Sequence, residues 1–135
     1  MRPVVRICRL PEADPSVPLP VYETAGAAGA DLRANLTAPV TLAPMARALI
    51  PTGLRMAIPD GFEVQIRPRS GLALKHGISL PNTPGTIDSD YREPLGVLLI
   101  NYGREPFLIR HGDRIAQMIV APVVQARFSV VDALG

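Results

Sequence analysis

Apolar and polar residues alternate along short stretches of the chain, and turn-forming residues separate these stretches. Every second residue is apolar in the runs Leu54–Ile58 and Phe62–Ile66, and Pro59-Asp60-Gly61 lies between them. A period of two is typical of a strand with one buried face, and Pro-Asp-Gly is typical of a tight turn. The pattern therefore predicts a hairpin that supplies core packing.

Four other stretches predict further strands: Val4–Cys8, Leu95–Ile100, Phe107–Ile109 and Arg114–Val120. The second of them follows a segment rich in proline and glycine, which favours the buried second arm of a hairpin. His111-Gly112-Asp113 is typical of a turn between the last two strands. Gln117 lies among apolar residues, so its amide needs a partner and either ties down backbone or contacts a ligand.

Proline and glycine content indicates the fold class. With 15 prolines and 11 glycines in 135 residues, few windows are long enough for an extended helix. One short helix is expected after Arg69, because Ser70 suits an N-cap and Gly77 suits a stop. Lys75 and His76 suit its last turn. We therefore predict one all-β domain over residues 1–135, a β-sandwich or barrel with one short helix.

Composition and charge exclude several classes of protein. Apolar residues make up 47% of the chain, which argues against disorder, and no apolar run has the length of a membrane span or signal peptide. The net charge is +2 and the charges are scattered, so we expect no nucleic-acid partner and no membrane partner. The one cysteine, Cys8, favours a reducing, cytoplasmic location and a buried packing role for the thiol.

Candidate chemistry is concentrated in Pro81–Asn101. Asp88 and Asp90 have the same phase in an extended segment, so their carboxylates could hold hydrated Mg²⁺ or activate a water. The alternative is that Asp-Ser-Asp caps a turn. Asn82 offers the donor and acceptor that a pyrimidine edge requires. Tyr91 is either a flat surface for a sugar or a half-buried strand aromatic.

The predicted helix offers a second candidate site. Its first backbone N–H groups have no internal partner, so they could bind phosphate, and Arg69 just before them adds a planar, charged donor. An ordinary capped helix is the alternative. Asp31 follows Gly-Ala and is either a turn residue or part of a site. We interpret His76 as a helix-end residue, because no nearby residue would orient it as a base.

Four segments together resemble the motifs of the trimeric deoxyuridine triphosphatase (dUTPase) family. They occur in the family's order and spacing, from about residue 25 to 119: AGAAGADLRA at Ala25–Ala34, PRSGLALKHG at Pro68–Gly77, the Pro81–Asn101 hairpin, and GDRIAQMI at Gly112–Ile119. The resemblance implies a homotrimer of jelly-roll-like β-subunits with active sites between subunits. It also implies hydrolysis of dUTP to dUMP and pyrophosphate with Mg²⁺, which limits uracil misincorporation and supplies dUMP for thymidylate synthesis.

The same resemblance implies residue roles. Asp88 matches the general base that activates water at the α-phosphorus, and Tyr91 matches the residue that packs on deoxyribose. Asp31 matches an aspartate that supports the metal-phosphate region, while the metal itself is held chiefly by triphosphate oxygens and waters, without a direct protein ligand. Phosphate contacts fall to Arg69, Ser70, Gly71 and Gln117, and the uracil and sugar site to Asn82, Thr86, Ile87, Asp88 and Gly96.

Two departures from the family pattern stand out. Glu93-Pro94 replaces the usual glycine and its successor after Tyr91-Arg92, which predicts a locally altered hairpin exit. The glycine-rich fifth motif is absent, so we expect the native protein to continue beyond Gly135 with a mobile lid. Two alternatives stay open: a nucleotide-binding trimer without turnover, and a dCTP deaminase-like relative, against which the Ile-Asp-Ser-Asp-Tyr segment argues.

Overall fold

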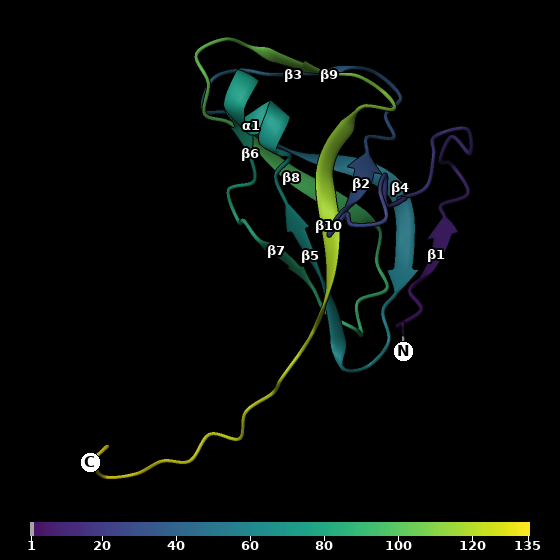
Figure 1. Ribbon diagram of the computed structural model, residues 1–135. Coiled ribbons are helices and arrows are strands. Elements are labelled where there is room, and N and C mark those ends of the chain that lie inside the picture. Colours follow the sequence, from purple (N-terminus) through teal and green to yellow (C-terminus); the bar gives the residue numbers. More distant parts are fainter. Residues whose placement is uncertain (1) are drawn as a thin grey trace.

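Two antiparallel four-stranded sheets face one another in the computed structural model, which describes residues 2–135 (Figure 1). The first sheet has the order β1 (Arg6–Arg9), β4 (Arg47–Ala57), β8 (Leu95–Asn101), β6 (Ile78–Ser79). The second has the order β2 (Ala30–Arg33), β10 (Arg114–Pro122), β5 (Phe62–Arg67), β7 (Gly85–Ile87). A small sheet pairs β3 (Val40–Leu42) with β9 (Phe107–Ile109), and the one helix is α1 (Ser70–His76). The all-β prediction with one short helix is confirmed.

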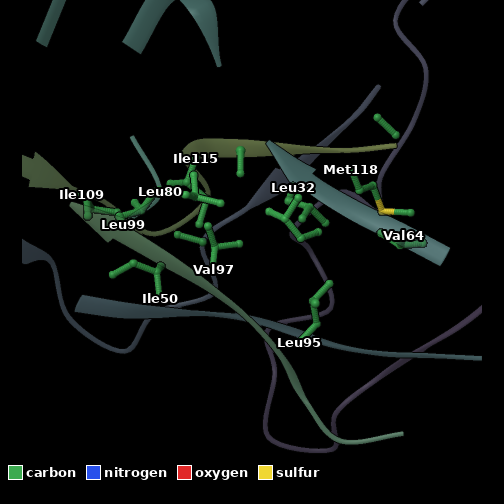
Figure 2. Packing of buried hydrophobic residues seen from close by; sticks show 14 of the residues in the cluster. Leu32, Ile50, Val64, Leu80, Leu95, Val97, Leu99, Ile109, Ile115 and Met118 are labelled. Carbon is green, nitrogen blue, oxygen red and sulfur yellow. The ribbon is translucent and has the colours of Figure 1, made fainter. Parts of the chain in front are cut away.

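The core lies between the two large sheets (Figure 2). Leu32 and Val64 from one sheet and Val97 and Leu99 from the other are at most 1% exposed. Because successive strand residues point to opposite faces, the apolar alternation fills this layer and leaves the polar residues outside. Each such side chain contributes about 1.5–3 kcal/mol on burial, so the sandwich is held chiefly by this layer.

Sheet pairing differs from the two predicted hairpins. The turn at Pro59–Gly61 exists, with Gly61 at φ 85° and the Phe62 N–H donating to the Pro59 carbonyl. However, β4 pairs with β1 and β8, whereas β5 pairs with β10 and β7, so this turn carries the chain from one sheet to the other. The connection from β7 to β8 makes the same crossing. Both hairpin predictions are wrong. Two strands bury the same alternate residues whether they pair within one sheet or lie in two sheets that face each other, so the pattern cannot distinguish the two arrangements.

Helix α1 begins one residue earlier than predicted. Arg69 is the N-cap, with extended φ −89° and ψ 132°, and no side chain caps the helix, so the predicted Ser70 cap is wrong. The Arg69 side chain is instead held by Asp31, and Ser70 is the first helical residue. The predicted stop is confirmed, because Gly77 adopts the left-handed conformation at φ 69° after the basic residues Lys75 and His76.

A buried asparagine fixes the end of β8. The Asn101 amide nitrogen donates to the carbonyls of Leu42 (2.9 Å) and Glu105 (2.8 Å), and its oxygen accepts from the Gly103 N–H (2.8 Å). Asn101 is fully buried, and Tyr102 next to it donates its N–H to the Gly77 carbonyl. The Asn101 side chain therefore links β3 to the loop before β9, and the backbone of Tyr102 links the end of β8 to the end of α1.

An exposed hydrogen bond between Asp14 and His111 joins the loop before β2 to the turn before β10. His111 Nδ1 accepts the Leu36 N–H, so Nε2 carries the hydrogen and donates to Asp14 at 2.8 Å. The backbone N–H and the hydroxyl of Ser16, followed by His111, lower the pKa of Asp14 from 3.8 to about 2. The carboxylate form of Asp14 is therefore favoured by the fold.

The N-terminal strand exposes its cysteine, and the C-terminal segment is extended. Cys8 is exposed on the edge strand β1 while its neighbour Ile7 is half-buried, so the predicted buried role for the thiol is wrong. Residues 123–135 leave the body as an extended segment (Figure 1). Within residues 2–135, no helix combines the length and apolar character needed to cross a membrane.

Candidate active site

A cationic cleft of about 450 Å³ opens where β5 ends and α1 begins. Its lining comes from the end of β5, the start of α1, the connection before β7 and one residue of β10: Arg67, Pro68, Arg69, Ser70, Ala73, Thr83, Pro84 and Gln117. The size lies in the range of small-molecule sites. The cleft thus brings together three sequence-predicted phosphate residues, Arg69, Ser70 and Gln117, whereas Gly71 is exposed in the first turn of the helix beside it.

Strand register places a polar row beside this cleft. Gln117 on β10 is the partner of Asp31 on β2 and of Arg67 on β5, so all three side chains lie on the outer face of the sheet. Asp31 Oδ1 accepts a hydrogen bond from Arg69 Nε at 3.1 Å, and Arg114 Nη1 lies 3.8 Å from Asp31 Oδ2. One carboxylate therefore faces two arginines, which leaves the cleft with a net positive charge suited to an anion.

The Gln117 side chain ties down backbone, which is one of the two roles that its sequence position allowed. Its amide nitrogen donates to the Pro68 carbonyl at 3.0 Å, so it holds the backbone immediately before Arg69. A Cβ added at Gly29 would collide with Gln117 Oε1, so the amide would have to shift from this position. Sequence reasoning missed Gly29, because the strand register that brings it to Gln117 is not visible in one sequence.

Asp88 begins a tight turn, and the prediction of an extended segment is wrong. Strand β7 ends at Ile87, the Tyr91 N–H donates to the Asp88 carbonyl at 3.1 Å, and Arg92 Nη1 donates to the Ser89 carbonyl at 2.6 Å. Asp88 and Asp90 are both exposed on this turn. They line a second cleft, of about 590 Å³, which also includes Asp60 and Glu63. The turn fixes Asp88 at the mouth of that cleft.

Tyr91 is held by the segment that departs from the family pattern. Its hydroxyl donates to the Pro94 carbonyl at 3.1 Å, and 39% of the residue is exposed. Pro94 thus supplies an acceptor that orients the ring, and one side of the ring stays open to a ligand.

The remaining predicted nucleotide residues are divided between the two sheets. Thr86 is exposed on β7, and Asn82 is exposed in the connection before it, near Gly85. Gly96 lies on β8 in the other sheet, where a Cβ would come within 2.8 Å of Leu49 Cδ1. Gly96 therefore has a packing role under Leu49, and the chain alone does not bring it to Thr86.

The two clefts lie at opposite ends of β5. Ile87 pairs with Val64, so the Asp88 turn adjoins Glu63 at the start of the strand, whereas Arg67 and Arg69 follow its other end. Because a strand rises about 3.3 Å per residue, the length from Glu63 to Arg67 separates the clefts by roughly 13 Å. A base must reach its proton directly or through one water, so Asp88 is too far to serve the cationic cleft of its own chain.

No cage for a metal ion forms within the described residues. Among residues 2–135, no three acidic, histidine or cysteine side chains come together in a group that could hold a metal. Asp31 has one oxygen bound to Arg69 and the other near Arg114.

Fold and site define a β-sandwich protein with a cationic cleft and a separate turn that carries a carboxylate. The family model described as dUTPase matches residues 16–135. A deoxyuridine 5'-triphosphate nucleotidohydrolase from Roseobacter denitrificans is 72% identical over 124 residues, which are 91% of this chain and 82% of the relative. One from Dinoroseobacter shibae is 62% identical over 136 residues, 97% of this chain and 88% of the relative. The chain belongs to the dUTPase family.

Solved structures share the fold at low sequence identity. A dUTPase mutant from phage phi11 of Staphylococcus aureus, described with a coordinated structural Mg(II) ion, has a TM-score of 0.83 at 20% identity and covers 96% of this chain and 97% of its own. A dUTPase mutant of phage 80alpha has a TM-score of 0.84 at 21% identity, covering 97% of this chain and 90% of its own. The sandwich is thus common to distant dUTPases.

Proposed function

We propose that this protein hydrolyses dUTP to dUMP and pyrophosphate. The observation that carries the proposal is the cationic cleft built from Asp31, Arg69, Ser70 and Gln117 in a chain of the dUTPase family. Both bacterial relatives bear the name deoxyuridine 5'-triphosphate nucleotidohydrolase. In the cell this activity limits uracil misincorporation and supplies dUMP for thymidylate synthesis.

The cleft binds the triphosphate in this proposal. Asp31 fixes Arg69 through Nε, so the outer guanidinium nitrogens face the anion, and Gln117 holds the Pro68 backbone that carries Arg69. Ser70 and Gly71 add donors from the first turn of α1. Because these groups are held before the substrate arrives, they stabilise charge on the phosphates without reorganising.

Asp88 acts as the general base. It takes a proton from the water that attacks the α-phosphorus in line, a step to which a positioned base contributes roughly 10²–10⁴-fold. Asn82 and the backbone of Thr86, Ile87 and Asp88 bind uracil, since a donor and acceptor set that fits uracil leaves polar groups unpaired against cytosine. Tyr91 packs on the deoxyribose, and Gly96 completes the sugar pocket.

The active site is completed between subunits of a homotrimer. The separation of roughly 13 Å along β5 between the Asp88 turn and the cationic cleft supports this, because one chain cannot apply its own base to its own bound triphosphate. In the proposed assembly the Asp88 turn of one subunit lies over the cleft of the next. Each subunit then contributes one half to two different sites.

Mg²⁺ is the cofactor in this proposal. When bound, it neutralises charge on the triphosphate oxygens. Asp31 is the residue of this chain that supports the metal-phosphate region, acting on the ion's water shell. The ligands come chiefly from the nucleotide, since the Asp31 oxygens already face Arg69 and Arg114.

The chain is proposed to act as a single domain in the cytoplasm. One continuous core joins both large sheets over most of the chain. The exposed, unpaired Cys8 thiol is compatible with a reducing compartment.

A substrate panel tests the proposal. The full chain is incubated with each of the deoxynucleoside triphosphates and dUTP in the presence of Mg²⁺, and monophosphate, pyrophosphate and ammonia are measured. We expect dUMP and pyrophosphate in equal amounts from dUTP, and little product from dCTP or dTTP. Binding without product would indicate a nucleotide-binding trimer, ammonia from dCTP would indicate a deaminase, and either result would refute the proposal.

A further inference from the structure

Arg67 has a position in the cationic cleft that the proposed mechanism does not use. It is exposed at the end of β5, lines the cleft with Arg69 and Ser70, and is the cross-strand partner of Gln117. Asp31 flanks Gln117 on one side and Arg67 flanks it on the other. An anion beside Gln117 would therefore meet Arg69 from the helix side and Arg67 from the strand side.

A neutral neighbour orients the Arg67 guanidinium. Gln65 lies two residues earlier on the same face of β5, and its Oε1 accepts from both Nη2 (2.6 Å) and Nε (3.2 Å) of Arg67. Fixing a long side chain costs conformational entropy, so an exposed arginine is ordinarily not held by two hydrogen bonds. Since a planar fork held in advance loses less entropy on binding, this arrangement suits a phosphate.

Arg67 differs from the neighbouring arginines because no carboxylate of the described chain compensates its charge. Arg69 and Arg114 both face Asp31, whereas among residues 2–135 no carboxylate lies within 4.0 Å of the Arg67 guanidinium. Gln65 orients the group without cancelling its charge. The full positive charge of Arg67 is thus available to a ligand in the cleft.

We propose that Arg67 is a further phosphate-binding residue, which binds the pyrophosphate portion of the substrate, and that Gln65 is its positioning residue. This inference rests on the proposed function for the identity of the substrate. The base must reach the α-phosphorus from another subunit, so the α-phosphate lies towards the mouth of the cleft. The β- and γ-phosphates, which carry most of the negative charge, lie among Arg67, Arg69 and Gln117.

Anion binding by purified variants tests the proposal. Binding of inorganic triphosphate, pyrophosphate and dUMP is measured by calorimetry with Mg²⁺ present for the parent protein and for Arg67→Gln. The matched control is Arg55→Gln, because Arg55 is exposed on β4 in the other sheet and makes no ion pair within the described chain. Arg67→Gln should weaken binding of triphosphate and pyrophosphate by about 10-fold, a typical effect of one charge-assisted hydrogen bond. The affinity for dUMP and the Tm should not change.

Gln65→Leu tests the positioning role. It should weaken triphosphate binding by about 3-fold in the parent, since one neutral hydrogen-bonding group is lost, and should have no effect in the Arg67→Gln background. Equal losses in both backgrounds would assign Gln65 a different role.

Several results would overturn the proposal: unchanged triphosphate affinity in Arg67→Gln, an equal loss in Arg55→Gln, an equal loss of dUMP affinity, or a parent protein that does not bind inorganic triphosphate. Hydrolysis of dUTP is measured separately. A parent protein that binds inorganic triphosphate through Arg67 but leaves dUTP intact would refute the proposed function while supporting this inference.

Discussion

Replacing Asn101 by alanine removes the only fully buried polar side chain that the structure describes. The substitution deletes hydrogen bonds to the Leu42 and Glu105 carbonyls and from the Gly103 N–H, each 2.8–2.9 Å long. Those backbone groups lie in two segments around the end of β8, namely β3 and the loop between β8 and β9. None of them gains a new partner from an alanine side chain.

The expected loss of folding stability follows from the number of hydrogen bonds that the substitution removes. Each contributes about 1 kcal/mol net, so the three together are worth roughly 3 kcal/mol, before the cost of leaving carbonyls unpaired in the interior. For a domain of this size, such a loss lowers Tm by about 10 °C. Asn101→Asp should cost at least as much, because it turns the donor that faces Leu42 and Glu105 into a buried, charged acceptor.

Urea unfolding followed by far-ultraviolet circular dichroism measures this change at one fixed protein concentration, since assembly affects apparent stability. Thr52→Val is the matched control, because Thr52 is also buried on the same sheet and makes one side-chain bond, from its hydroxyl to the Leu95 carbonyl at 2.7 Å. It should cost about 1 kcal/mol. The estimate from the number of hydrogen bonds is refuted if the unfolding free energy of Asn101→Ala is within about 1 kcal/mol of the parent value, or if the two variants are equally destabilised.

Three further outcomes are expected. Asp88→Asn should lower kcat by about 10²–10⁴-fold while a non-hydrolysable dUTP analogue binds within a few-fold of the parent, and a decrease below about 10-fold would remove Asp88 as the base. Tyr91→Ala should raise kcat/KM for UTP relative to dUTP, because loose apolar contact rejects a hydroxyl only about 10²-fold, and an unchanged ratio would contradict the sugar contact. The folded state lowers the pKa of Asp14 from 3.8 to about 2, so its stabilising effect is complete above pH 3.8 and is lost as pH falls towards 2. The difference in unfolding free energy between the parent and Asp14→Asn should therefore be constant near neutral pH and shrink across that window in acid urea titrations, and a difference independent of pH would contradict it.

Local structure was predictable wherever one residue type determines the backbone. Gly61 and Gly112 adopt positive φ in the two expected turns, and Gly77 ends the helix where the pattern requires it. The alternation in Leu54–Ile58 and Phe62–Ile66 identifies the buried faces correctly. Strand pairing was not predictable, because alternation specifies which face is buried and not which neighbour supplies the backbone hydrogen bonds.

Some of the predicted site residues lie together in the structure, but their geometry was not predictable from the sequence. Arg69, Ser70 and Gln117 share one cleft, as expected of phosphate residues. Asp88 lies on a turn at the far end of β5, because hydrogen bonds within Asp88–Arg92 outweigh the extended conformation that two aspartates in phase would favour. Gly29 was missed, since its contact with Gln117 depends on a partner far away in the sequence. Gln65 was missed as well, although its partner Arg67 lies only two residues away on the same strand.

The position of the two clefts at opposite ends of β5 has a consequence for mixtures of defective chains. Under the proposed shared site, a chain that lacks the Asp88 carboxylate still has an intact cationic cleft, and a chain that lacks Arg69 still has an intact Asp88 turn. When two such chains co-assemble, an interface that joins the intact cationic cleft of one chain to the intact Asp88 turn of the other forms a complete site, although neither protein has activity alone. By the same geometry, dilution below the concentration at which subunits associate should abolish turnover even in chains that remain folded.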